Sequence, residues 1–239
     1  MQAKKTITNP FFDLSKFELF LWICSVVFVT LSFLLVPTKD YLTLIASLIG
    51  VTALIFVAKG YVLGQILTVV FAVFYGIISF YFQYYGEMIT YLCMTSPIAI
   101  MSVISWLRHP YGDSSEVTVQ RMTNRQTRKM CIYTILVTII FFYILKALNT
   151  ANLLFSTISV ATSFLASYMS MMRSPYYALG YSANDIVLII LWILATLETP
   201  SYFPMIICFF MFLINDIYGF INWRRMENRQ KSTYILPQS

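Results

Sequence analysis

Long apolar runs separated by short polar breaks occupy most of the chain. A helix needs about 20 apolar residues to cross the roughly 30 Å hydrocarbon core of a bilayer. Eight runs meet this length and are predicted to be transmembrane helices. Their predicted bounds are residues 17–36, 41–58, 61–82, 88–107, 130–148, 152–172, 176–197 and 202–223. The predicted fold class is therefore an all-α integral membrane protein with eight transmembrane helices.

The amino-acid composition agrees with this pattern and argues against a water-soluble protein. Of the 239 residues, 59% are hydrophobic and 11% are charged, whereas a soluble domain carries about 25% charged residues. The 16 lysines and arginines are unevenly placed: if the N-terminus is cytoplasmic, the outer loops hold only Lys39 and Lys146. The positive-inside rule then places both termini in the cytoplasm. The net charge of +6 follows from this topology, so no nucleic acid is expected as a partner.

Residue types that carry metal, haem or nucleotide chemistry are sparse. The four cysteines are scattered without a CxxC pair, and the single histidine, His109, lies in a basic loop. This composition excludes a haem held by two histidines and argues against a metal cluster or a membrane-embedded enzyme. No GxxxxGK[ST] segment occurs, so the chain is not itself an ATP-driven pump. No cofactor is expected.

The chain matches itself when it is shifted by 117 residues. In the 24-residue window that starts at Tyr85, eight positions are identical, among them Tyr85 with Tyr202 and Trp106 with Trp223. The match predicts two three-helix repeats, residues 41–107 and 149–225, joined by a loop and linker helix, residues 108–148. Residues 1–40 add one extra helix, and residues 226–239 form a tail. Parallel repeats in a 3+1+3 arrangement are an architecture of SWEET-type transporters.

Two aspartates interrupt the apolar runs. Asp185 and Asp216 each follow an asparagine, Asn184 and Asn215, and a carboxylate at a helix centre costs about 2.5–3.5 kcal/mol on insertion scales. These residues either form hydrogen bonds that fix helix packing or belong to a substrate site. The first repeat has Thr68 at the position of Asp185, so we expect the second repeat to bind most of an asymmetric substrate.

Aromatic side chains share a helix face with Asp185. Tyr177, Tyr181, Asp185 and Trp192 are spaced four, four and seven residues apart, which puts them on one face. Such a face suits a flat heterocycle, because rings stack on it for about 1–3 kcal/mol each. Tyr177 is instead interpreted as an interfacial aromatic residue. Tyr91 and Thr95 are further candidate substrate-binding residues, because they precede a helix kink predicted at Pro97. The remaining candidates are Gln65, Thr68 and Tyr75. Thr68 and Tyr75 are the repeat counterparts of Asp185 and Trp192.

Several of these residues stand in motifs that resemble the PnuC family of vitamin transporters, over about residues 41–230. Residues 181–185 are similar to the family's WxxxN segment, and residues 215–225 are similar to its closing YGxxxW pattern. Tyr181 stands in place of the motif tryptophan and Asp185 in place of the asparagine. A shift of one residue would instead pair Gly180 with Asn184. These departures leave the substrate open.

The resemblance implies a uniporter that imports nicotinamide riboside, a precursor of NAD, by facilitated diffusion and alternating access across a bacterial cytoplasmic membrane. It also implies a homotrimer and a cytoplasmic kinase that traps the substrate. Asp185 would then offset the positive nicotinamide ring or bind the ribose, Tyr181 and Trp192 would enclose the ring, and Asn184 or Asn215 would bond the amide or sugar. The alternatives are a PnuC-like carrier of thiamine, riboflavin or a deoxynucleoside, and the substrate-binding subunit of an ATP-driven vitamin importer.

Overall fold

The computed structural model describes residues 9–37, 40–81 and 85–235, and these residues form helices and no β-strand. Eight helical segments within them are long and apolar enough to cross a membrane, which confirms the predicted fold class and number of spans. They are α1 (Lys16–Leu35), α2 (Tyr41–Ala58), α3 (Val62–Tyr81), a fourth span made of α4 (Tyr85–Ile89), a π-helical turn (Thr90–Thr95) and α5 (Ser96–Leu107), then α6 (Asn124–Ala147), α7 (Leu153–Met171), α8 (Tyr177–Glu198) and α9 (Phe203–Ile235). Short 3-10 helices cover Pro10–Asp13 and Pro200–Tyr202.

Three helices differ from the sequence prediction for local reasons. Helix α6 begins at Asn124 rather than at residue 130, because Thr123 and Gln126 form a capping box outside the apolar run. The fourth span begins at Tyr85 and contains a π-helical turn just before the predicted kink at Pro97. Helix α9 continues past residue 223 because its polar end is held by ion pairs, described below.

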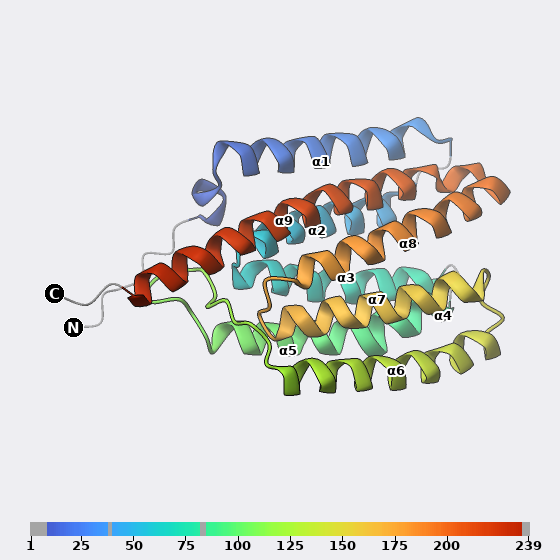
Figure 1. Ribbon diagram of the computed structural model, residues 1–239. Coiled ribbons are helices and arrows are strands. Elements are labelled where there is room, and N and C mark those ends of the chain that lie inside the picture. Colours follow the sequence, from blue (N-terminus) through green and yellow to red (C-terminus); the bar gives the residue numbers. More distant parts are fainter. Residues whose placement is uncertain (1–8, 38–39, 82–84, 236–239) are drawn as a thin grey trace.

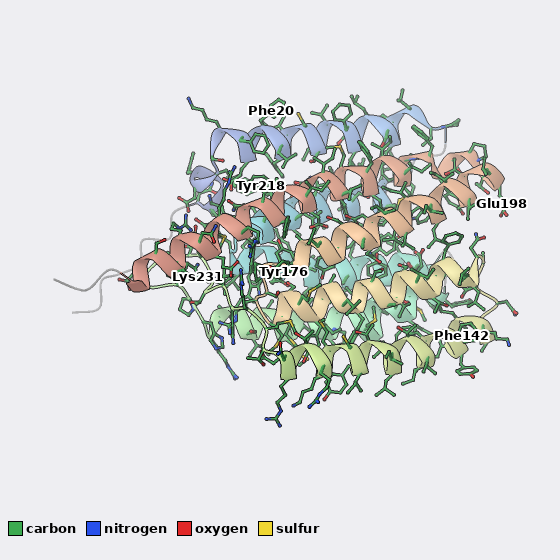
Figure 2. The ribbon with its side chains drawn as sticks, in the orientation of Figure 1. Phe20, Phe142, Tyr176, Glu198, Tyr218 and Lys231 are labelled. Atoms are coloured by element: carbon green, nitrogen blue, oxygen red, sulfur yellow. The ribbon has the colours of Figure 1, made fainter. Side chains whose placement is uncertain are left out.

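Six of the spans form a closed ring. Around it α2 packs on α3, α3 on α5, α5 on α7, α7 on α8, α8 on α9, and α9 on α2 again. Helix α6 packs on the outside of α7, and α1 lies against the outside of α2 and α9 (Figure 1). The outer faces of α1 and α6 carry exposed apolar side chains, such as Phe20, as expected of surfaces in contact with lipid (Figure 2). Each predicted three-helix repeat supplies one half of the ring.

Two reciprocal hydrogen bonds from tryptophan side chains join the two halves of the ring. Trp106 Nε1 on α5 donates to Ser170 O near the end of α7 (2.9 Å), and Trp223 Nε1 on α9 donates to Val57 O near the end of α2 (2.9 Å). Both indoles are fully buried and pack on each other with ring centroids 5.3 Å apart. Each bond links the last helix of one half to the first helix of the other. This reciprocity supports the duplication, which stays a prediction.

Helix α1, which precedes the ring, is held by buried polar contacts. Glu18 is 3% exposed and accepts hydrogen bonds from Tyr218 Oη (2.8 Å) and Lys59 Nζ (3.2 Å). Further along α1, Ser25 Oγ accepts a hydrogen bond from Asn215 Nδ2 (2.9 Å). Lipid offers such groups no partner, so their pairing ties α1 to α2 and α9.

A segment between α5 and α6 crosses both halves at the end of the bundle where α2, α5, α7 and α9 end, which we call the terminal end (Figure 1). In this connecting segment, residues 108–123, Val117 N donates to Gly60 O (2.9 Å) and Gln120 N donates to Arg173 O (3.0 Å). Gly60 and Arg173 follow the ends of α2 and α7, and both have positive φ angles, 74° and 57°. Arg173 Nη2 also donates to Gln120 Oε1 (2.6 Å), and burial lowers the pKa of its guanidinium. The connecting segment therefore bonds to corresponding turns in the two halves.

A buried carboxylate attaches the connecting segment to the polar end of α9. Glu227 is 3% exposed and forms ion pairs with Arg121 of the segment and with Arg224 and Lys231 of α9. Gln230 also bonds to the backbone of the segment with both ends of its side-chain amide. The connecting segment thus covers the terminal end of the ring and is held there by hydrogen bonds and ion pairs.

We predict that Glu227→Gln loosens the terminal end. The amide keeps the shape of the side chain but loses its ion pairs, so the midpoint of thermal unfolding in detergent should fall by about 2–5 °C. Trypsin should also cut the connecting segment faster. The matched control is Glu116→Gln, which removes a more exposed pair with Arg229 and should have the smaller effect on both measurements. Equal effects of the two variants would contradict the anchoring role of Glu227.

Candidate functional site

A cavity of about 460 Å³ lies inside the ring, on the side away from the terminal end. Its walls come from α3, the fourth span, α7, α8 and α9, so both halves of the ring contribute to it. The turn between α6 and α7 lies at its mouth, as does Glu198, which ends α8 at the side farthest from the terminal end (Figure 2). We call this space the main cavity.

Aromatic rings form two walls of the main cavity. Tyr75 of α3 and Tyr91 of the fourth span pack with ring centroids 4.7 Å apart, and Trp192 of α8 packs on Tyr202 at 5.6 Å. The π-helical turn brings Tyr91 and Thr95 to the same wall. Such turns insert an extra residue into a helix and often occur at functional sites. The faces of these rings can stack on a flat ligand.

Asn184 supplies an oriented amide to the main cavity. Its Oδ1 accepts hydrogen bonds from Ser159 Oγ (3.1 Å) and Thr162 Oγ1 (2.9 Å), both on α7. Among the described residues Nδ2 has no hydrogen-bond partner, so the amide N–H groups remain for a ligand. Asn184 lines the cavity and Asp185 does not. The register of the family motif, with Asn184 or Asp185 at the asparagine position, stays a prediction.

Glu87 on α4 lies between the main cavity and a second cavity of about 260 Å³. The Tyr75 hydroxyl lies near its carboxylate, whereas Oε2 is buried and has no partner among the described residues. No Lys, Arg or His of the described chain lines either cavity. The sequence prediction missed Glu87 because it began the fourth helix at residue 88. A start at Tyr85 would have placed this carboxylate inside a span.

Asp185 and Asp216 form a carboxyl pair that lies outside the cavity wall. They are each 3% exposed and lie close together, so two ionised carboxylates would repel each other and a shared proton would relieve that repulsion. Asp185 Oδ2 is buried without a further partner among the described residues. Tyr181, one helical turn away, shares a hydrogen bond with Ser167 Oγ of α7 (3.0 Å). These side chains fill the space between the main cavity and the tryptophans of the terminal end.

Three further candidates make contacts between or within helices. Gln65 Nε2 donates to Ser170 Oγ across the α3–α7 interface (2.9 Å), and Thr68 Oγ1 donates to a carbonyl of its own helix (2.9 Å). Asn215 faces α1. The interfacial interpretation of Tyr177 is wrong, because this residue is 1% exposed and packs on a buried tryptophan.

The main cavity thus brings together five of the eleven candidates, namely Tyr75, Tyr91, Thr95, Asn184 and Trp192. The other six, Gln65, Thr68, Tyr181, Asp185, Asn215 and Asp216, lie outside its wall. Sequence reasoning missed the hydroxyl-bearing residues Ser159, Ser163 and Tyr202, because serines and tyrosines are common throughout the spans. The described residues contain no cluster of His, Cys, Asp and Glu that could hold a metal ion.

Comparisons with known proteins agree on one group of relatives. A family model described as nicotinamide mononucleotide transporter matches residues 40–225. The chain is 26% identical over 217 residues to the nicotinamide riboside transporter PnuC of Neisseria mucosa, covering 88% of this chain and 80% of the relative. It is 23% identical over 198 residues to the protein of the same name from Haemophilus influenzae, covering 81% and 84%. A crystal structure of the vitamin B3 transporter PnuC has a TM-score of 0.77 at 22% identity, covering 91% of this chain and 94% of that one, so the fold is shared.

The carboxyl pair generates a stability prediction. In Asp185→Asn the new amide can donate to Asp216 without a shared proton, so the midpoint of thermal unfolding in detergent at pH 8 should rise by about 2–4 °C. The control is Asp40→Asn, whose side chain caps α2 by accepting the Thr43 N–H. Asparagine caps equally well, so this variant should leave the midpoint unchanged. A lower midpoint for Asp185→Asn would show that the carboxylate itself is needed.

Proposed function

The chain belongs to the nicotinamide mononucleotide transporter family, and we propose that it imports nicotinamide riboside, a precursor of NAD, through the main cavity. The observation that carries this proposal is the cavity itself, which combines aromatic faces, hydroxyls and one oriented amide inside a ring of spans. Its volume of about 460 Å³ falls within the roughly 300–1,000 Å³ typical of small-molecule sites. The names of both relatives from the sequence search make nicotinamide riboside the first substrate to test.

The polar and aromatic groups of the cavity suit the two parts of such a ligand. Tyr75, Tyr91 and Trp192 provide ring faces for the nicotinamide. The free N–H groups of Asn184 can donate to a carboxamide or ribose oxygen, and the Thr95 hydroxyl can bond a sugar hydroxyl. A bound ligand would satisfy polar atoms that the protein leaves unpaired, which is the usual source of specificity in a buried site.

Transport requires that the cavity open alternately to the two sides of the membrane. We propose that the two halves of the ring rock against each other, as in other transporters built from repeats. The family resemblance supports facilitated diffusion by a uniporter. Opening of the terminal end would separate the bonds of the connecting segment. It would also bring Tyr181, Asp185 and Asp216 to the substrate path.

We place the terminal end in the cytoplasm of a bacterium. Basic side chains such as Arg173, Arg225 and Lys231 gather at that end, where nitrogen-rich side chains extend from the bundle (Figure 2). This asymmetry follows the positive-inside rule. The main cavity then faces the outside, which is the state that loads substrate for import.

Two partners complete the proposal. The family resemblance supports a homotrimer in the membrane and a cytoplasmic kinase that phosphorylates the substrate and so prevents its return. The second candidate function is transport of thiamine, riboflavin or a deoxynucleoside through the same cavity. The departures from the family motif support this alternative. A role as the substrate-binding subunit of an ATP-driven importer predicts that the isolated chain cannot transport.

The substrate test uses the purified full-length chain in liposomes without ATP. We expect uptake of nicotinamide riboside down its gradient, with weaker binding of thiamine and riboflavin in titrations of the detergent-solubilised protein. Asn184→Ala should weaken nicotinamide riboside binding about three- to tenfold, because one hydrogen bond is lost. The matched control is Asn228→Ala on the exposed polar end of α9, which should bind normally. Uptake that needs an added ATPase would support the importer-subunit alternative.

Orientation is tested by labelling single cysteines in intact bacterial cells. With the four native cysteines replaced by serine, Glu198→Cys at the cavity mouth should react with a membrane-impermeant maleimide added outside. Ser232→Cys, at the terminal end of α9, should react only after the cells are broken. The reverse pattern would invert the proposed topology.

A further inference from the structure

Glu87 is half-buried, and it differs in its partners from the two buried glutamates, Glu18 and Glu227. Glu18 is paired with a lysine, and Glu227 is paired with two arginines and a lysine. Glu87 forms no ion pair within the described chain, where the Tyr75 hydroxyl is a polar neighbour of its carboxylate. A buried carboxylate oxygen without a partner is costly in a membrane bundle. This cost calls for a ligand that supplies the missing partner.

The surroundings of Glu87 define the chemistry of that ligand. Its carboxylate lies on the wall of the main cavity, beside the packed rings of Tyr75 and Tyr91. Trp192 and Tyr202, which line the same two cavities as Glu87, provide a second aromatic pair. Aromatic faces attract organic cations, and a carboxylate attracts them more strongly. Metal ions fit poorly here, because one carboxylate among rings offers too few oxygen ligands.

We propose that Glu87 is the residue that makes the transporter select a flat organic cation over a neutral molecule of the same shape. This inference rests on the proposed function and refines it: nicotinamide riboside carries a fixed positive charge on its pyridinium ring, whereas its dihydro form is neutral. Glu87 would lie next to the charged ring while the tyrosines and tryptophan cover its faces. Asn184 would then bind the uncharged groups of the ligand.

Glu87 takes the role that sequence reasoning assigned to Asp185. The Asp185 carboxyl already interacts with Asp216 and lies outside the cavity wall. The only other acidic residue among those that line the main cavity is Glu198, at the mouth, where water screens its charge. Within the described chain, Glu87 is therefore the one carboxylate that combines a buried oxygen without a partner and contact with the main cavity.

The test compares Glu87→Gln with the wild-type protein in titrations against nicotinamide riboside and its dihydro form. We expect the wild type to prefer the cation, and Glu87→Gln to weaken cation binding by about tenfold or more while changing the neutral form by less than about threefold. The matched control, Glu198→Gln, should keep the wild-type preference.

The outcomes separate this inference from the proposed substrate. If Glu87→Gln weakens both forms equally, or if it retains the preference for the cation, the selectivity role is overturned. If the wild type binds neither form, the proposed substrate is wrong. The same variants are then compared on thiamine, a cation, and riboflavin, a neutral molecule, and a preference that survives Glu87→Gln again overturns the role.

Discussion

Polar groups inside a bundle surrounded by lipid must find partners within the protein, and the arrangement of the helices depends on this constraint. The bonds of Trp106 and Trp223 satisfy two indole N–H groups, and the same bonds hold α5 against α7 and α9 against α2. Glu18 likewise draws Lys59 and Tyr218 together and so positions α1. Each of these interactions offsets the free-energy cost of burying a polar group and also holds two helices together.

The constraint is met differently at the two ends of the ring. At the terminal end the connecting segment, the turns after α2 and α7 and the polar end of α9 bond to one another, with Glu227 at the centre. At the opposite end the main cavity leaves the Asn184 N–H groups and one Glu87 oxygen without partners among the residues that the structure describes. Other buried atoms, such as Asp185 Oδ2 and Asn215 Oδ1, also lack partners among the described residues, but these two side chains do not line the main cavity.

Helix periodicity predicted some residues of the candidate site and not others. The spacing of Asp185 and Trp192 directed attention to α8, and two residues of this helix, Asn184 and Trp192, line the main cavity. Periodicity did not reveal that Asp185 points toward α9, because that depends on the rotation of α8 against its neighbours. The cost of a buried carboxylate was a sound criterion, but it also marks pairs such as Asp185 and Asp216. Glu87 meets the same criterion and was missed only through the predicted start of its helix.

The amino-acid sequence by itself determined that the chain crosses the membrane eight times and belongs among transporters of this kind. Span number follows from a local condition, since each apolar run must match the thickness of the bilayer. Only the tertiary structure decided which polar residues face a cavity and which face another helix. Gln65 and Ser170 are 105 residues apart, yet their bond sets how α3 faces α7. Such contacts depend on packing between distant segments, and the pattern within any one helix does not contain that information.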